Sequence, residues 1–275
     1  MNKRLNYTML TTLLFIFTVF LVGCSSSKSA ISFKSADFSK FQDRGYVTVG
    51  FDDTFVPMGF KDDNGKIVGF DIDLAKEVFK RIDIKVKFQP IDWAMKETEL
   101  NSGKIDLIWN GYTITEERKQ KVSFTKAYIE NRQIIVTLAD SSIKNKSDLA
   151  GKVVAAQNGS SSLDAINKEP ELAATFKDGE PVLFETNNEA LMDLEAGRTD
   201  AVVADEIMAR YYINKRGEKK YKVIGEDFGK EEYGVGMRKV DTELLEKVDK
   251  ALKDMQNDGV YTEIYKKWFG ENTEK

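Results

Sequence analysis

The stretches LNSGKIDLIW at residues 100–109 and LEAGRTDAVV at residues 194–203 have the same build. Each reads as a helix end, a glycine that stops the helix, a basic residue, and an aspartate that opens an apolar strand. Helices that alternate with buried strands are typical of a parallel, doubly wound sheet. Because the unit occurs twice, we predict an α/β protein with two lobes of similar build.

The polar loops that follow these two strands are the first place to expect a ligand. They are NGYT at residues 110–113 and ADE at residues 204–206. Ligands of open α/β sheets bind beyond the carboxyl ends of the strands, so two facing lobes would bring these loops together. Residues 132–138 read as an extended crossing between the lobes, and the chain is expected to return near residues 228–237.

Other elements follow from hydrophobic periodicity and end signals. Residues 45–50 and 84–88 read as strands. A helix capped by Asp71 or Asp73 is expected between them, with its apolar face formed by Leu74, Ala75, Val78, Phe79 and Ile82. Two amphipathic helices, over residues 242–257 and 260–268, are expected to end the fold.

Composition excludes several classes of function. The chain has 275 residues, 41% hydrophobic, which is enough for one large or two medium domains. Its net charge of −4 gives no electrostatic footprint for nucleic acid. The absence of histidine removes the commonest general base and metal ligand. One cysteine permits neither an intrachain disulfide nor a cysteine-based zinc site. We expect no metal, no cofactor and no catalytic residue.

The N-terminus accounts for the single cysteine. Lys3 and Arg4 precede an apolar run, and the run ends in LVGC at residues 21–24. This resembles a lipoprotein signal peptide, which implies removal of residues 1–23 and lipidation of Cys24. An ordinary secretory signal is the alternative. Residues 24–40, rich in serine and lysine, read as a flexible tether, so the remainder is expected to be a soluble part tied to a membrane surface.

Arg118 is the clearest candidate for binding an anion. Thr115 reads as the N-cap of a helix, and Arg118 falls in its first turn, where the helix dipole favours anions. An arginine fork grips a carboxylate with two parallel hydrogen bonds. A solvated surface arginine is the alternative. The segment from Gln157 to Leu163 follows a strand and opens a helix capped by Ser160, so its free N–H groups form a second candidate anion site, or simply a capped helix start.

Three other residues complete a constellation. Asp205 comes just after a buried strand, where an unpaired carboxylate is costly unless a cation meets it. Phe55 and Trp93 are aromatic residues next to loops, although most such residues belong to a core. Arg118 for a carboxylate, Asp205 for an ammonium and aromatics for an aliphatic stem match a zwitterionic α-amino acid.

Several motifs in order then resemble the polar amino-acid-binding proteins of ABC importers, which are family 3 of the bacterial extracellular solute-binding proteins. They cover residues 40–270 and read VGFD (49–52), PMGF (57–60), GKIVGFDIDLA (65–75), TITEER (113–118), VSFTKAY (122–128) and GRTDAVVAD (197–205). One departure is Ala127, where the family usually has proline. The resemblance implies a type II periplasmic-binding-protein fold, with two mainly parallel sheets flanked by helices and joined by two extended crossings. It places residues 41–133 with 230–275 in the first lobe and residues 134–229 in the second.

The resemblance also implies roles for individual residues. Arg118 would clamp the α-carboxylate, helped by Thr113 and the N–H groups around Ser160 and Ser161. Asp205 would take the α-ammonium, helped by Thr113 and the backbone of Asn110 and Gly111. The candidate ligand residues are completed by those around the side chain and by the loop glutamine, namely Asp52, Phe55, Trp93 and Gln157.

The implied function is capture of a polar amino acid and its delivery to a membrane permease. Arginine, histidine, glutamine and cystine all stay open, because Asp52 could pair with a cation or accept a hydrogen bond from an amide. The protein is expected to be a monomer, lipid-anchored on the extracytoplasmic face of a Gram-positive cell membrane. One alternative is an enzyme such as a cyclohexadienyl dehydratase, which would need a general acid such as Glu97. A sensory domain and an adhesin-like protein are further alternatives.

Overall fold

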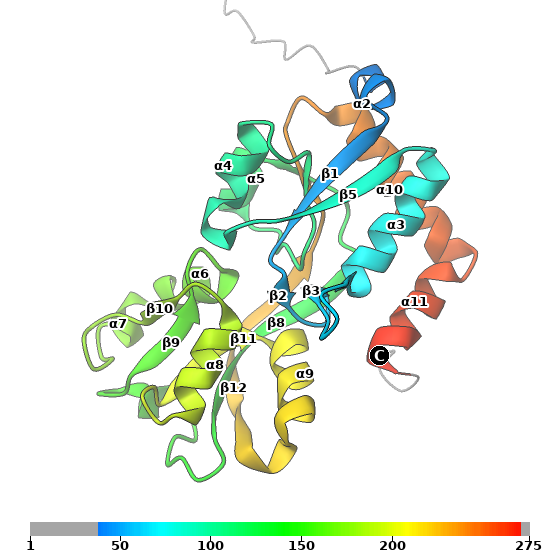
Figure 1. Ribbon diagram of the computed structural model, residues 1–275. Helices are drawn as coiled ribbons and strands as arrows, with labels where there is room; N and C mark the ends of the chain where they lie inside the picture. The colour runs from blue at the N-terminus through cyan, green and yellow to red at the C-terminus, as the bar shows by residue number, and fades with distance from the viewer. Residues whose placement is uncertain (1–37, 271–275) are drawn as a thin grey trace, which may run out of the picture. The chain divides into compact units, whose positions relative to one another are not determined.

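The first of two five-stranded sheets takes four strands from residues 46–124 and one strand from residues 236–237. The computed structural model describes residues 38–270. The strand order is β5-β1-β6-β13-β7, with bounds Lys85–Pro90, Tyr46–Phe51, Leu107–Ile108, Gly236–Met237 and Ser123–Phe124 (Figure 1). β1 pairs in parallel with both β5 and β6, whereas β13 is antiparallel to β6 and β7. Val47 and Val49 of β1 are fully buried, which explains its central place.

The second five-stranded sheet has the order β10-β9-β11-β8-β12. Its strands are Val182–Phe184, Val154–Gln157, Ala201–Asp205, Ile129–Leu138 and Tyr221–Tyr233. β9 is parallel to β10 and β11, whereas β8 runs antiparallel to β11 and β12. Every residue of β11 is buried, as expected for a central strand covered on both faces. The predicted fold class, two mainly parallel sheets flanked by helices, is confirmed.

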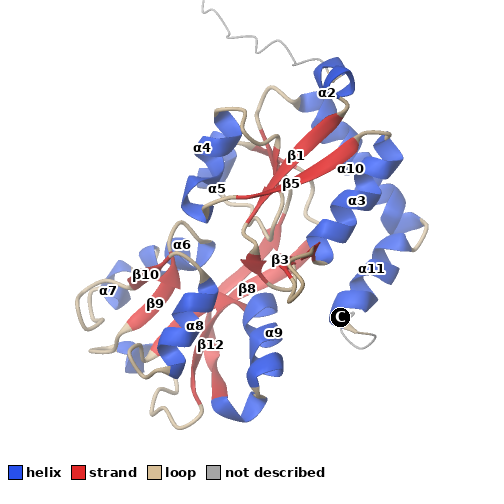
Figure 2. Cartoon of the chain, in the orientation of Figure 1, coloured by secondary structure: helices blue, strands red, loops and turns tan. Residues whose placement is uncertain are grey.

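Helices flank both sheets (Figure 2). Around the first sheet, α3, α10 and α11 contact one another, and α4 and α5 lie on the other side (Figure 1). The first lobe consists of this sheet and its helices. The helices are Ser39–Arg44 (α2), Phe70–Ile82 (α3), Trp93–Met95 (η1), Lys96–Asn101 (α4), Glu116–Lys121 (α5), Thr242–Asn257 (α10) and Val260–Phe269 (α11). A small sheet packs beside α3 and consists of Thr54–Phe55 (β2), Gly59–Lys61 (β3) and Ile67–Val68 (β4).

The second lobe, formed by the second sheet and its helices, follows the same plan. Its helices are Lys146–Leu149 (η2), Ser161–Asn167 (α6), Pro170–Ala173 (α7), Asn187–Glu195 (α8), Glu206–Arg216 (α9) and Glu218–Lys220 (η3). Two of them follow a sheet strand closely: three residues separate β9 from α6, and α9 begins directly after β11. The polar residues at these strand ends therefore collect at one edge of the sheet.

β8 and β12 pair along nearly their whole length, from Tyr221 opposite Leu138 to Tyr233 opposite Ile129, with two register shifts. The predicted extended crossing at residues 132–138 is part of β8. The guanidinium of Arg132 on β8 binds the carboxylate of Glu206, with 2.8 Å between Nη2 and Oε1, and also that of Asp227 on β12. These ion pairs tie the two strands to the start of α9.

The start of α3 differs from the prediction. Neither Asp71 nor Asp73 caps this helix, because the helix begins one residue before Asp71 and its N-cap is Gly69. Gly69 has a φ of +144°, and a Cβ there would lie 2.2 Å from the carbonyl oxygen of Met58. Asp71 is instead buried and accepts a hydrogen bond from the backbone N–H of Gly111 at 2.8 Å. The aspartate thus fixes the loop after β6 and not the helix end.

The last residues of the predicted tether belong to the fold. Phe38 is buried and α2 starts at Ser39, so the last three residues of the segment 24–40 belong to the fold. The prediction at Cys24 lies outside the described residues. Within residues 38–270, none of the helices has the length and apolar character needed to cross a membrane.

Candidate ligand-binding site

A small cavity between the two lobes is lined by ten of the eleven residues predicted from the sequence. Its volume is about 10 Å³, room for about one water molecule. The first lobe contributes Asp52, Phe55, Trp93, Asn110, Gly111 and Arg118, and the second contributes Gln157, Ser160, Ser161 and Asp205. Thr113 lines an adjoining cleft of about 440 Å³, which Ser161 also lines. Residues far apart in the chain therefore meet at one place.

Arg118 occupies the first turn of α5, as predicted. Thr115 caps the helix, since its side chain accepts a hydrogen bond from the backbone N–H of Arg118. Arg118 is 4% exposed, and its guanidinium lies over the ring of Tyr112. It donates to the carbonyl oxygens of Thr113 at 3.1 Å and Gly159 at 3.4 Å, and it pairs with the carboxylate of Asp164 at 3.2 Å. Arg118 thus holds a carboxylate already, one supplied by α6 of the second lobe.

The loop before α6 forms the predicted capped helix start. Ser160 is the N-cap of α6, and its hydroxyl accepts from the backbone N–H of Leu163. Gly159 has a φ of +67°, and a Cβ there would come within 2.9 Å of the Cα of Ala94 in the first lobe. Only glycine permits so close an approach at this backbone conformation.

Asp205 ends β11 and is 3% exposed. Its Oδ1 accepts hydrogen bonds from the side-chain amides of Asn131 at 2.7 Å and Gln133 at 2.9 Å, and from the hydroxyl of Tyr233. Within residues 38–270 the carboxylate forms no ion pair, so its charge is held by neutral donors alone. Such a site favours the arrival of a cation.

Asp52 and Gln157 face each other across the cavity. The amide of Gln157 donates to Oδ2 of Asp52 at 2.8 Å, and its own oxygen accepts from Asn187 at 2.7 Å. Burial raises the pKa of Asp52, although hydrogen bonds from Thr54 and Gln157 act in the opposite direction. Phe55 and Trp93, both mostly buried, form the apolar wall beside this pair. A ligand group placed here would meet one acid, one amide and two aromatic rings.

Asn110 and Gly111 belong to the loop after β6. The side-chain oxygen of Asn110 accepts from the backbone N–H of Asp52 at 3.0 Å, which joins the two strand ends. Gly111 has a φ of +57°, and a Cβ there would lie 2.6 Å from the ring of Phe55. This close packing sets the depth of the cavity.

The two lobes touch at the site through several polar contacts. Thr113 donates to the hydroxyl of Ser161 at 2.9 Å, and the ammonium of Lys96 donates to the carbonyl of Gly159 at 2.8 Å. Burial and the nearby Arg118 lower the pKa of Lys96 to about 8. Because these contacts close the cavity to the size of a water molecule, an amino acid can enter only if the lobes separate or the lining side chains move.

Sequence reasoning missed a group of polar residues on the two crossings. They are Asn131 and Gln133 on β8 and Glu231 on β12. Asn131 and Gln133 are two apart and therefore share one face of the strand, a period-2 signal that was available. Glu231 stands opposite Asn131 in the register. Asp164, which meets Arg118, and Lys96 were also missed.

No chemistry beyond binding emerges from the cavity lining. Glu97, the acid that an enzyme alternative would need, does not line the cavity and accepts a hydrogen bond from Tyr112 at 2.9 Å. Over residues 38–270, no three acidic or thiol side chains are grouped so that they could hold a metal ion.

Comparison with known proteins agrees with the fold and the site. Residues 47–271 match the family of bacterial extracellular solute-binding proteins, family 3. The chain is 32% identical over 271 residues to the ABC transporter glutamine-binding protein GlnH of Bacillus subtilis, covering 94% of this chain and 96% of the relative. It is 31% identical over 239 residues to the L-cystine-binding protein TcyJ of Escherichia coli, covering 86% and 87%.

A solved structure resembles the whole fold. It is that of an ABC uptake transporter substrate-binding protein from Streptococcus pneumoniae with bound histidine. The identity is 44% and the TM-score 0.82, and the match covers 85% of this chain and 96% of that one. All three relatives are described as binding proteins, which supports a binding protein over the enzyme alternative.

Proposed function

The chain belongs to family 3 of the bacterial extracellular solute-binding proteins, and from that membership we propose that it captures a polar amino acid between its lobes and hands it to an ABC importer. The observation that carries the proposal is that Arg118 of the first lobe and Asp205 of the second line the same cavity. A guanidinium on one side and a carboxylate without an ion pair on the other suit the two charges of a zwitterion.

The proposed roles follow from these positions. Arg118, Thr113 and the N–H groups near Ser160 and Ser161 bind the α-carboxylate. Asp205 binds the α-ammonium, with the backbone of Asn110 and Gly111 beside it. The side chain lies among Asp52, Phe55, Trp93 and Gln157.

The cargo is arginine, histidine, glutamine or cystine. Asp52 and Gln157 give the far end of the cavity a hydrogen-bond acceptor and an amide, which suit a guanidinium, an imidazole, an amide or a second amino-acid head. The relatives are described as binding histidine, glutamine and L-cystine. Charge-assisted hydrogen bonds contribute about 1.5–3 kcal/mol each, so four or five would suffice for micromolar affinity, about −8 kcal/mol.

The motion is hinge closure. The division into a first lobe of residues 41–133 with 230–275 and a second of residues 134–229 places the bend in β8 and β12. Ligand favours the closed state because only that state offers contacts from both lobes. The protein acts as a monomer, held by a lipid on Cys24 at the extracytoplasmic face of a Gram-positive membrane, where the permease reads the closed surface.

Calorimetric titration of the purified protein tests the proposal. After unfolding and refolding to strip bound ligand, it is titrated with each of the twenty amino acids and with cystine. We expect the wild-type protein to bind one or a few polar amino acids tightly. The variant Arg118→Ala should stay folded and bind no amino acid. A folded wild-type protein that binds no amino acid would refute the proposed function.

A further inference from the structure

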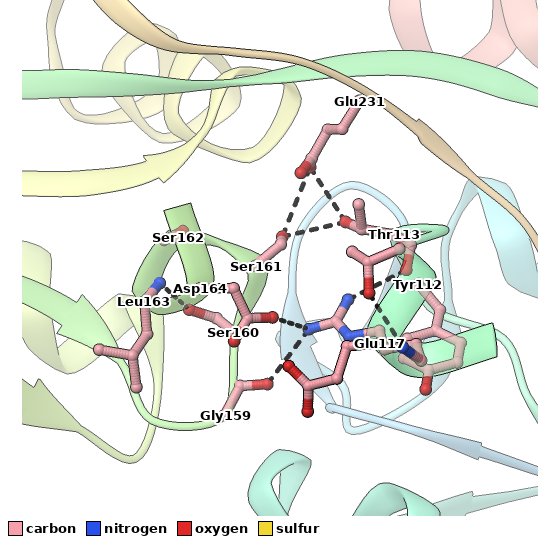
Figure 3. A network of polar contacts seen from close by, with 12 residues as sticks. Tyr112, Thr113, Glu117, Gly159, Ser160, Ser161, Ser162, Leu163, Asp164 and Glu231 are labelled. Carbon is pink, nitrogen blue, oxygen red and sulfur yellow. Dashed lines mark hydrogen bonds and ion pairs between the residues drawn. The ribbon is translucent and has the colours of Figure 1, made fainter. Parts of the chain in front are cut away.

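Glu231 is a carboxylate that the cavity lining does not include but that lies at its edge. Its Oε1 lies within hydrogen-bond distance of two hydroxyl oxygens, 3.0 Å from that of Thr113 and 3.4 Å from that of Ser161. Figure 3 shows the Glu231 carboxylate pointing at these two hydroxyls, which also bond to each other. Glu231 therefore stands where the two lobes meet, on the side of the adjoining cleft.

The same two amides hold Glu231 and Asp205 together. The amide nitrogens of Asn131 and Gln133 lie 2.6 and 2.7 Å from Oε1 of Glu231, and both also donate to Oδ1 of Asp205. Their orientation is fixed from behind, because the amide oxygen of Gln133 accepts from the hydroxyl of Ser162 and that of Asn131 from the N–H of Ile207. The NH₂ groups must then face the two acids.

Two carboxylates that share donors in this way repel each other. Neither Glu231 nor Asp205 forms an ion pair within the described part of the chain. The other charged or titratable groups nearby are Arg118 and Tyr233 and those lining the cleft, namely Glu116, Glu117, Asp164, Lys168 and Lys230. Burial, and then the charge of Asp205, raise the pKa of Glu231 to about 8. Without a cation nearby, this environment favours the protonated form of Glu231.

We propose that Glu231 is a second carboxylate of the ligand site, which binds the ammonium group of the cargo together with Asp205. This inference rests on the proposed function, because it concerns the same zwitterionic ligand. An ammonium has three N–H donors, and Asp205, Glu231 and Thr113 offer oxygen acceptors within one small region. The ammonium would replace the shared proton as the positive charge between the two acids.

Binding should therefore release a proton. The Glu231 carboxyl loses its proton to the buffer as the ammonium arrives, so affinity rises with pH, by roughly tenfold per pH unit while the free protein still holds that proton. With a pKa of about 8 for Glu231, the rise should span pH 5.5 to 7.5. Over this range the ammonium of a free amino acid stays charged.

The test compares wild type, Glu231→Gln and Glu232→Gln by calorimetry. Glu232 is the matched control, because it is the next residue of β12, is exposed, and points to the other face. The probes are L-arginine, L-histidine and L-glutamine, with the 2-hydroxy analogue of whichever binds most tightly. Titrations at pH 5.5, 6.5 and 7.5, each in two buffers of different ionisation enthalpy, count the protons released.

We expect wild type and Glu232→Gln to release close to one proton and to gain affinity with pH. Glu231→Gln should release none, show no pH slope and bind about tenfold more weakly at pH 7.5. The 2-hydroxy analogue lacks the ammonium, so its affinity should be the same for wild type and Glu231→Gln. Asp52 and Lys96 are other titratable groups near the cleft and could also make the affinity depend on pH. If the affinity of Glu231→Gln still rises with pH, the rise comes from such groups and the inference is overturned. Tight binding without proton release by wild type overturns it too, even if the variant fails to fold. Absence of all amino-acid binding would refute the proposed function itself.

Discussion

Single residues carry the site, and most of them could be predicted from the chain. Arg118 and Asp205 were recognisable because a cation in a first helical turn and an acid after a buried strand both need partners. Asn131, Gln133 and Glu231 were not, because their importance depends on which strands pair. Asp164 was missed because nothing near α6 indicated that its carboxylate would reach Arg118 in the other lobe.

The proposed role of Arg118 makes Asp164 a competitor of the cargo for its guanidinium. In this closed arrangement its carboxylate sits 3.2 Å from the guanidinium, in a half-exposed pair. Such pairs contribute about 0.2–1 kcal/mol. Asp164→Asn should therefore tighten amino-acid binding by up to about fivefold, measured by titration. Glu117→Gln, which removes the same charge from a residue that pairs with Lys121, should change affinity little. Weaker binding by Asp164→Asn would mean that Asp164 supports the ligand site.

Asp71 should make the stability of the protein depend on pH. Burial raises the pKa of Asp71 to about 7, and its Oδ1 lacks a hydrogen-bond partner. The folded state then holds a proton that the unfolded state releases near pH 4, so the free energy of unfolding falls as pH rises from about 4 to about 7. Over that window the loss is about 4 kcal/mol.

Asp71→Asn keeps the acceptor for Gly111 and removes the titration. Urea unfolding between pH 4 and 8 should show a shallower fall for this variant than for wild type. Asp63→Asn, at an exposed position, should leave the profile unchanged. A slope equal to that of wild type in Asp71→Asn would show that Asp71 is charged in the folded protein over the whole range.

Among elements, those with long periodic patterns were predicted most closely. Helix α10 spans Thr242–Asn257, the range expected from its apolar stripe, and the predicted crossing lies within β8. The prediction for the start of α3 was wrong. Asp71 and Asp73 look like caps in sequence, but the close approach of Gly69 to Met58 fixes the helix start, and that approach belongs to tertiary structure.

Gly69 should therefore be far more sensitive to substitution than Gly65, another glycine with a positive φ. Gly69→Ala would place a Cβ 2.2 Å from a backbone oxygen, whereas Gly65, with a φ of +74°, has open space around it. We expect Gly65→Ala to lower the free energy of unfolding by about 1 kcal/mol and Gly69→Ala by at least about 3 kcal/mol, measured by urea denaturation. An equal loss of stability in the two variants would show that the contact with Met58 adds nothing to the cost of substituting Gly69.

For the whole molecule, the repeated unit and the family resemblance predicted two lobes of similar build, and the structure has two five-stranded sheets, each flanked by helices. What the sequence could not provide was the state of closure. Contacts such as Lys96 with Gly159 and Thr113 with Ser161 depend on how far the lobes have turned, and no local pattern encodes that angle.

Closure should be separable from folding at Gly159. A Cβ there meets Ala94 of the opposite lobe, whereas Gly151, with a φ of +70°, has nothing within 4 Å. Both alanine variants should lose about 1 kcal/mol of stability through backbone strain. Only Gly159→Ala should bind amino acids at least about tenfold more weakly and show a larger radius of gyration in X-ray scattering with ligand. Equal affinity and scattering for the two would exclude this contact from the ligand-bound state.

The two crossings, β8 and β12, carry Asn131, Gln133, Glu231 and Tyr233, so the strands proposed to bend also hold Glu231 and the three donors that bind Asp205. The same residues on the crossings would thus affect both which cargo binds and how the strands bend. Redesign of the protein as a sensor for another amino acid would be safest at Asp52, Phe55 and Trp93, which lie on one lobe alone. Changes on the crossings would retune the signal and its selectivity together.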